Sequence, residues 1–344
     1  MRGTLIVLGW ICALGGVRAM AGNKAQAPAT DRYARRCQDR EPSRWIDLQG
    51  TMLWGTWSGW TEKERTKSDD RKSVLVSAQL DGMVQSRQGV KVLRLESGRL
   101  TAAGGSAAGS VLQGMGSDGR PVEVAICDAE TVPGDNGTTW YRIEVWNSEA
   151  REWENPCVPT EALAHPRALA VGGVWDTGGA HHDVAGKITF ACQGGVIAKC
   201  ATWGYRPWAS HGGTSLAEAH QACTRMARAD YCGNGQSHTR EGTLIDYYDS
   251  LGLSSRATSA SSSWDPARAS FEAAWAPDGA TCIARTRGGD PVAAILKECP
   301  GRFKEAPADL GNGDRCVLQR AGQGPAVGLL RNRVGGAPAP AAGR

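Results

Sequence analysis

The feature that most constrains this chain is an even set of ten cysteines that follows an apolar N-terminal segment. The sequence contains 11 cysteines, and Cys12 lies inside that segment. We expect residues 1–21 to be an export signal: Arg2 is its basic start, Leu5 to Leu14 its apolar run and Ala19-Met-Ala21 its cleavage site. The run is about ten residues long, which is too short for a membrane-spanning helix. Cleavage would remove Cys12 and leave an even number of cysteines.

An even number of cysteines in an oxidising compartment indicates disulfide bonds, so we expect the mature protein to be periplasmic or extracellular. The sequence does not distinguish these two locations, and it leaves the pairing open. The cysteines expected to form bridges are Cys37, Cys127, Cys157, Cys192, Cys200, Cys223, Cys232, Cys282, Cys299 and Cys316.

Charge and hydropathy exclude several classes of partner. A net charge of +4 over 344 residues is small, and no dense basic cluster indicates nucleic acid as a ligand. No segment after the export signal is apolar enough to cross a bilayer, so we expect no transmembrane segment.

Changes in composition divide the chain into five expected parts. These are the signal (1–21), a flexible leader (22–45), a β-rich N-terminal region (46–150), a cysteine-rich domain (155–318) and a flexible tail (319–344). The tail is assigned from its run of glycine, alanine and proline. The cysteine-rich domain is assigned from its eight cysteines.

Alternating apolar residues predict strands in the N-terminal region, at Val74–Leu80, Pro121–Cys127 and Trp140–Trp146. In the cysteine-rich part, two hairpins are expected. One joins Ile188–Cys192 to Ala198–Trp203, and the other is centred on the turn Pro277-Asp-Gly279.

One principal helix is expected at about 216–230. Ser215 and Glu218 have the spacing of a capping box, apolar residues recur at intervals of three and four, and Gly233 is a candidate for the C-terminal cap. The expected fold is therefore α+β, mostly antiparallel β-strands with one principal helix, held together by disulfides.

The cysteine-rich part resembles the ADYC domain, a family of exported bacterial proteins whose molecular function is uncharacterised. The resemblance implies an exported bacterial protein and assigns no catalytic residue. It rests on six short motifs: Ala229-Asp-Tyr-Cys232, Thr189-Phe-Ala-Cys192, Ala198-Lys-Cys200, Trp203-Gly-Tyr-Arg-Pro-Trp208, His220 to Met226 and Gly242 to Asp246.

His220 and Cys223 are the first candidates for chemistry, because they lie one helical turn apart. A thiolate nucleophile needs a base within hydrogen-bonding reach. The even number of cysteines leaves no free thiol, so we expect Cys223 to form a disulfide and His220 to pack beside it.

Metal sites can be drawn from two groups of residues, but neither has the spacing of a zinc site. One group is Asp176, His181, His182 and Asp183, and the other is His211, His220 and Cys232. The loop from Asp309 to Asp314 has calcium-like composition without the ligand spacing of a calcium loop. We therefore expect no metal and no cofactor.

Four acidic residues near the end of the predicted helix could serve a hydrolase that works with paired carboxylates. They are Asp230, Glu241, Asp246 and Asp249. An acid at the C-terminal end of a helix opposes the helix dipole. We therefore expect Asp230 to be structural, and to be held by an arginine or by backbone amides around Gly233 to Gly235.

The preferred function is a non-catalytic binding module of the envelope or the extracellular space, with a surface glycan or an envelope protein as partner. The alternative is a secreted hydrolase that uses the carboxylates near the end of the 216–230 helix. The chain contains no G-x-S-x-G, P-loop, dinucleotide-binding or H-E-x-x-H motif. The sequence thus leans against an enzyme.

Overall fold

A computed structural model of the chain divides into two compact units, residues 1–34 and residues 35–344. The structure describes residues 29–38, 48–49, 73–85, 92–102, 105–116, 119–132, 138–148, 151–157, 164–239, 243–322 and 328–336. In the first unit the described element is helix α1 (Ala29–Ala34). The predicted signal and Glu241 lie outside the described residues, so the signal stays a prediction.

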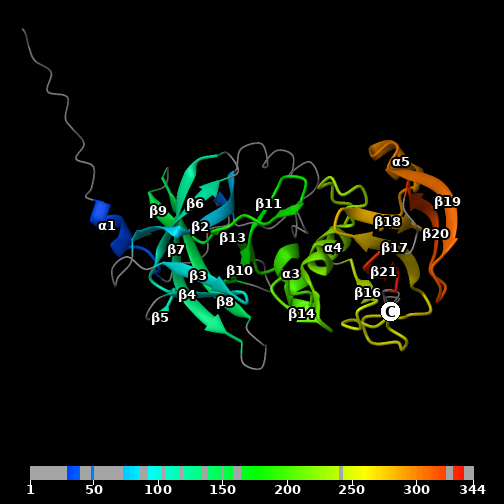
Figure 1. Cartoon of the computed structure of the whole chain (residues 1–344), viewed down its shortest axis with the longest axis horizontal. Coiled ribbons are helices and arrows are strands. Elements are labelled where there is room, and N and C mark those ends of the chain that lie inside the picture. The colour runs from blue at the N-terminus through cyan, green and yellow to red at the C-terminus, as the bar shows by residue number, and fades with distance from the viewer. Residues whose placement is uncertain are drawn as a thin grey trace, which may run out of the picture. The chain divides into compact units, whose positions relative to one another are not determined.

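The N-terminal strands form a sheet that closes on itself. Its ring runs in the order β2 (Ser73–Gln85), β13 (Lys187–Cys192), β10 (Ala168–Gly172), β8 (Thr139–Asn147), β7 (Pro121–Thr131) and β6 (Val111–Gly116), and β6 pairs again with β2 (Figure 1). Two short strands extend it, β1 (Leu48–Gln49) on β2 and β9 (Glu152–Glu154) on β8. The pairs within the ring are antiparallel.

Side chains alternate along each strand, and the apolar ones that point inward fill the core of this closed sheet. Leu75, Leu112, Ile126, Ile143 and Phe190 are at most 1% exposed and belong to one apolar cluster. The strands predicted at Val74–Leu80, Pro121–Cys127 and Trp140–Trp146 are confirmed as parts of β2, β7 and β8. Beside them, β3 (Leu93–Glu96), β4 (Arg99–Ala102) and β5 (Gly105–Ser106) form a small sheet of their own.

A second, fully antiparallel sheet has six strands. Their order is β16 (Ile245–Asp249), β21 (Leu330–Val334), β17 (Ser270–Ala276), β18 (Gly279–Ile283), β20 (Arg315–Arg320) and β19 (Phe303–Asp309). The predicted hairpin around Pro277 to Gly279 is confirmed as the β17–β18 connection.

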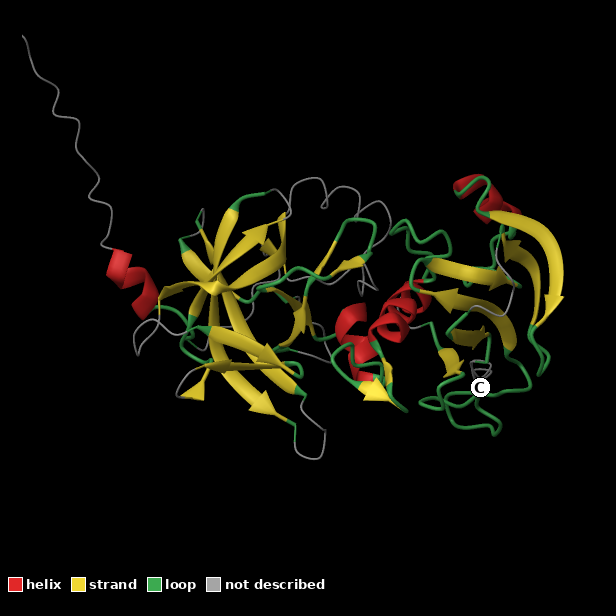
Figure 2. Cartoon of the chain, viewed as in Figure 1, coloured by secondary structure: helices red, strands yellow, loops and turns green. Residues whose placement is uncertain are grey.

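Among the described residues from 35 onward, three helices accompany the sheets: α3 (Val196–Thr202), α4 (Ala217–Arg228) and α5 (Ala293–Glu298). Helix α3 contacts β13 and α4, and α4 packs on β17, β18 and β21 (Figure 2). Two short hairpins complete this part, β11 (Val174–Trp175) with β12 (His181–His182) and β14 (Ser210–His211) with β15 (Thr214–Ser215). The predicted class is confirmed: mostly antiparallel strands with one principal helix.

All ten cysteines form disulfides, as the even count predicted. The pairs are Cys37–Cys127, Cys157–Cys192, Cys200–Cys223, Cys232–Cys299 and Cys282–Cys316. No helix in the part of the chain that the structure describes is both long and apolar enough to cross a membrane.

Two local predictions about helices are wrong. Residues 198–203 were expected to form a strand, but Val196–Thr202 is helix α3. Short apolar runs do not distinguish a buried helix from a strand. The predicted capping box does not form at the start of α4: the cap position is Leu216, without a side-chain cap, although the Ser215 hydroxyl accepts a bond from the amide of Ala217.

Three predicted boundaries also differ from the structure. The closed sheet takes β10 and β13 from the segment assigned to a separate cysteine-rich domain (155–318). The leader (22–45) contains α1 and a disulfide-bonded Cys37. The tail (319–344) contains β21, which lies between β16 and β17. Pairing between strands far apart in sequence, which local composition does not encode, accounts for the first and last of these differences.

Candidate binding site

The Ala229 to Cys232 segment begins where α4 ends. Ala229 adopts the left-handed conformation, with φ 53° and ψ 41°, and is fully buried. Its amide bonds to the carbonyl of Met226, and the amide of Asp230 bonds to the carbonyl of Arg225. These bonds satisfy the last carbonyls of the helix and reverse the chain. The left-handed cap is thus Ala229, and not the predicted Gly233.

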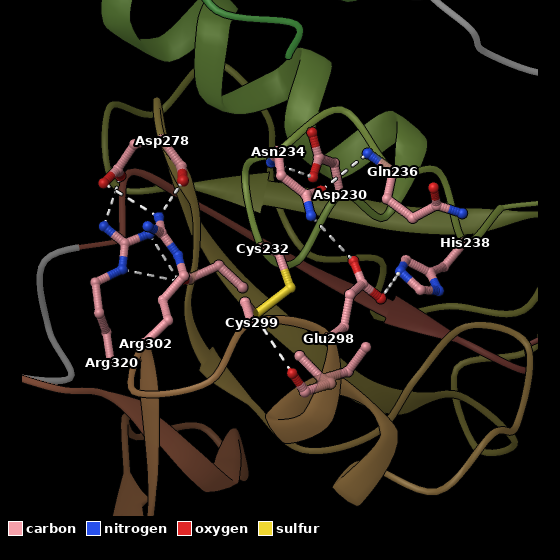
Figure 3. Close-up of a disulfide and its surroundings, with 12 residues drawn as sticks. Asp230, Cys232, Asn234, Gln236, His238, Asp278, Glu298, Cys299, Arg302 and Arg320 are labelled. Carbon is pink, nitrogen blue, oxygen red and sulfur yellow. Dashed lines mark hydrogen bonds and ion pairs between the residues drawn. A yellow bond between two sulfur atoms is a disulfide. The ribbon is translucent and has the colours of Figure 1, made fainter.

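Asp230 is fully buried and held on both sides. Its carboxylate accepts a bond from the Arg225 guanidinium at 2.6 Å, and bonds from the amides of Asn234 at 3.1 Å and Gly235 at 3.0 Å. Figure 3 shows the chain turning around this carboxylate. The predicted partners, an arginine and nearby backbone amides, are present, and the structural role of Asp230 stays a prediction.

Tyr231 connects the segment to the six-stranded sheet. Its ring is buried and stacks on Trp275, with ring centroids 5.3 Å apart. Its hydroxyl donates to Glu272 at 2.9 Å and accepts from the amide of Arg287 at 2.7 Å. Burial, with the negative charge of Glu272, raises the pKa of Tyr231 well above its ordinary value. The hydroxyl therefore stays protonated and holds both partners.

Arg287 follows β18 and is bonded at every N–H of its guanidinium. Two bonds reach the carboxylate of Glu272, both at 3.1 Å. The others reach the carbonyls of Met226 at 2.7 Å and Ala227 at 2.9 Å, and the hydroxyl of Thr239 at 3.1 Å. An arginine has five donors, so none remains for a ligand. Arg287 fixes its loop to the end of α4.

Cys232 and Gly233 fix the same segment to its surroundings. Cys232 forms a disulfide with Cys299, the residue after α5 (Figure 3). Gly233 has φ +67°, and a Cβ there would lie 1.9 Å from the carbonyl oxygen of Asp278. Only glycine therefore allows the segment to approach the β17–β18 turn so closely.

A second link to α5 lies beside the disulfide. His238 and Glu298 form an ion-pair contact at 2.9 Å (Figure 3). The disulfide and this pair join both ends of the 232–238 segment to the end of α5. The loop between β18 and α5 is thus anchored by Arg287 near its middle, and α5, which follows the loop, is anchored by Cys299 at its end.

This loop forms one wall of a cavity of about 610 Å³. The other wall comes from the two residues before β16 and from the end of β21. The residues that line the cavity are Thr243, Leu244, Ala284, Arg285, Thr286, Arg287, Gly289, Asp290, Val292, Val334 and Gly335. Its volume lies within the usual range for small-molecule sites, roughly 300–1,000 Å³.

The wall loop is closed by its own hydrogen bonds. The Thr286 hydroxyl donates to the carbonyl of Asp290 at 2.5 Å, and the amide of Gly289 bonds to the carbonyl of Thr286. Two charged residues of the loop, Arg285 and Asp290, are exposed. Among the residues that the structure describes, neither side chain has a hydrogen-bond or ion-pair partner. Opposite them, Leu244 is 43% exposed.

The remaining acidic candidates do not form a catalytic pair. Asp246 binds Arg333 at 2.8 Å and accepts a bond from the amide of Ala257. Asp249 accepts the Tyr205 hydroxyl at 2.7 Å and the amides of the following turn. Residues 246 and 249 are an odd number of positions apart on β16, so their side chains lie on opposite faces of the strand.

The His220 and Cys223 candidate is structural. Cys223 is in a disulfide with Cys200, which leaves no thiol. His220 is 1% exposed, and its Nε2 lies 3.0 Å from the carbonyl oxygen of Ile197. Burial lowers the pKa of His220 to about 4, so the ring is neutral at pH 7 and donates to that carbonyl.

Neither predicted metal group forms a cluster of three ligating atoms among the described residues. His182 pairs with Asp176 at 2.7 Å, whereas His181 bonds to the carbonyl of Gly172. In the second group, Cys232 is in its disulfide and His220 is bonded to Ile197. The one cluster of metal-ligating atoms among the described residues is Cys37, Cys127 and Glu144. Its two sulfur atoms are joined in a disulfide.

The loop from Asp309 to Asp314 is a turn. The amide of Gly311 bonds to the Asp309 carboxylate at 2.9 Å, and the Asp314 carboxylate is buried against Tyr248, Arg256 and Arg331. Its acidic side chains are thus used within the fold.

Sequence reasoning missed the loop of Arg285, Arg287 and Asp290, and it missed Glu272. The segment Arg285-Thr-Arg-Gly-Gly-Asp290 is visible as a charged turn after a strand. Its two arginines look alike in sequence. Only the structure distinguishes Arg287, whose guanidinium donates five hydrogen bonds, from Arg285, whose side chain has no partner among the described residues.

A comparison of the sequence with known families identifies one domain. The model of the ADYC domain matches residues 104–289. The chain belongs to the ADYC-domain family. No curated protein and no solved structure matches the chain. The ADYC match covers the motif, Glu272 and Arg287, and it ends within the loop that forms the cavity wall.

Proposed function

We propose that this ADYC-domain protein is an exported, non-catalytic binding module whose ligand site is the cavity beside Arg287. The apolar run and cleavage pattern at residues 1–21 support export. Five disulfides fit an oxidising compartment outside the cytoplasm.

One observation carries the binding function: the ADYC motif holds a cavity wall that presents two unneutralised charges. Tyr231 bonds to the backbone of that wall, and Cys232 is bonded to the residue after α5. A wall fixed before the ligand arrives loses little conformational entropy on binding. Arg285 and Asp290 meanwhile remain available to a ligand.

The hydrolase alternative has less support. Asp230 and Asp246 are each paired with an arginine, and Asp249 is bonded to a tyrosine hydroxyl and backbone amides. A glycoside hydrolase needs two carboxylates that flank one bond, with one of them protonated. No two of the described acidic candidates are arranged in this way.

Ligand screening with two matched variants tests the proposal. The mature chain is screened by thermal shift against short peptides, muropeptide fragments and chito-oligosaccharides. Leu244→Trp fills the cavity, and Val317→Trp places the same side chain at an aliphatic position of similar exposure on β20. We expect at least one compound to raise the Tm of the wild type and of Val317→Trp, because a ligand stabilises the state that binds it. Leu244→Trp should respond weakly.

Two results would contradict the proposal. One is that no compound shifts the Tm of the wild type, and the other is that Leu244→Trp responds as the wild type does. Chromatography of the same mixtures tests the alternative: cleavage of an oligosaccharide that Asp246→Asn abolishes would establish a hydrolase.

A further inference from the structure

The cavity carries two separate charges of opposite sign. The charge of Arg287 is neutralised by its two bonds to Glu272. Arg285 and Asp290 have no such partner among the described residues, and the turn Thr286–Gly289 separates them along the chain. The site therefore offers one cation and one anion, with a net charge near zero.

Among the described residues, the rest of the lining includes four aliphatic side chains and no aromatic ring. Leu244, Ala284, Val292 and Val334 supply its aliphatic part. Sugar rings are commonly bound on large aromatic faces, and such a face is missing from the lining. Aliphatic side chains therefore suit this lining better than a glycan does.

We infer that the cavity binds a short apolar peptide with a free carboxylate and a free ammonium group, an inference that rests on the proposed function. The carboxylate pairs with Arg285, whose planar guanidinium can bind both carboxylate oxygens. The ammonium group pairs with Asp290. The aliphatic side chains of the peptide lie against Leu244 and Val292.

Charge complementarity disfavours the other ligand classes. A phosphate or another polyanion would be attracted by Arg285 and repelled by Asp290. A neutral glycan would leave both charges without a partner after desolvation, which costs binding free energy. A ligand with one charge of each sign satisfies both residues.

Calorimetric titration with four forms of one peptide tests this inference. The probe is alanyl-leucyl-alanine with both ends free, N-acetylated, C-amidated or blocked at both ends. We expect each blocking group to weaken binding about tenfold or more, because bonds between charged partners contribute on that scale.

Single substitutions then assign each end of the peptide to a residue. Arg285→Gln should lower the affinity for the peptide with a free carboxylate and leave the affinity for the C-amidated peptide unchanged. Asp290→Asn should remove the difference in affinity between the peptide with a free amine and the N-acetylated peptide. Arg94→Gln and Asp183→Asn, two exposed charges on β3 and in the turn after β12, are the matched controls and should bind as the wild type does.

The outcomes separate this inference from the proposed function. If the four peptides bind equally, or if Arg285→Gln weakens the acid and the amide alike, the assignment of the ends is wrong. If none binds while another compound shifts the Tm in a manner that Leu244→Trp abolishes, the ligand class is wrong and the binding function stands. If peptide binding survives Leu244→Trp, the cavity is not the site.

Discussion

Asp230 brings a negative charge into the interior at the end of α4, where the helix carbonyls already make the potential negative. Burial without partners would cost several kcal/mol. Arg225 and two backbone amides offset this cost. The position therefore depends on its hydrogen bonds, and we predict that Asp230 stabilises the turn.

Substitution of Asp230 should lower stability in two steps. Asp230→Asn keeps the shape and loses the charge that Arg225 faces, at a cost of about 1–3 kcal/mol. Asp230→Ala leaves the charge of the buried Arg225 without a carboxylate partner, although its bonds to two backbone carbonyls remain, and should cost about 3–5 kcal/mol. The measurement is urea unfolding, and Asp183→Asn at a fully exposed acid is the control. Unchanged unfolding midpoints in both Asp230 variants would show that the carboxylate is not structural.

At the scale of elements, strands β2, β7 and β8 of the closed sheet could be predicted because alternation encodes them directly. Strand β21 could not, since its sequence Leu330-Arg-Asn-Arg-Val334 reads as polar. Its buried Arg333 and Asn332 are compensated by Asp246 and Glu272, which are 87 and 60 positions away. A pattern read locally does not contain those partners.

The candidate site was hidden for the same reason. The contacts of Arg287 lie between 15 and 61 positions away in sequence. The structural role of Asp230 could be predicted, because its arginine and its amides are at most five positions away. Local partners were therefore predictable, and distant ones were not.

The disulfide between Cys232 and Cys299 should control the order of α5. Its replacement by two serines should cost about 2–4 kcal/mol of stability and should raise hydrogen exchange in residues 293–299. Cys157→Ser with Cys192→Ser, which opens a bridge within the closed sheet, is the control. Under native conditions it should leave α5 protected. Equal loss of protection in both double variants would mean that α5 is held by other contacts.

At the scale of the whole molecule, one bridge joins two paired strands, because Cys282–Cys316 links β18 to β20, and others connect elements that do not pair as strands. Cys200–Cys223 joins α3 to α4, and Cys232–Cys299 joins the motif to α5. The largest apolar cluster also joins several elements, since it contains residues of α3, α4 and the six-stranded sheet. His220 on α4 packs edge-on against the ring of Trp175 on β11, with the two ring centroids 5.9 Å apart. Solvent therefore reaches this histidine only when the surrounding packing opens.

This burial predicts how stability depends on pH. The pKa of His220 is about 4 in the folded protein, against 6.5 as the ordinary value. As pH falls below 6.5, His220 binds a proton in the unfolded chain but stays neutral in the folded chain, so stability decreases. Between pH 7.5 and pH 5 the loss of unfolding free energy from this residue should be about 2 kcal/mol.

The variant His220→Gln tests this prediction. It keeps a donor for the Ile197 carbonyl and cannot be protonated, so its unfolding free energy should decline less over the same interval. Both proteins share every other titrating group, so those contributions cancel in the difference. Parallel curves from urea unfolding at each pH would show that His220 is not protected from protons in the folded state.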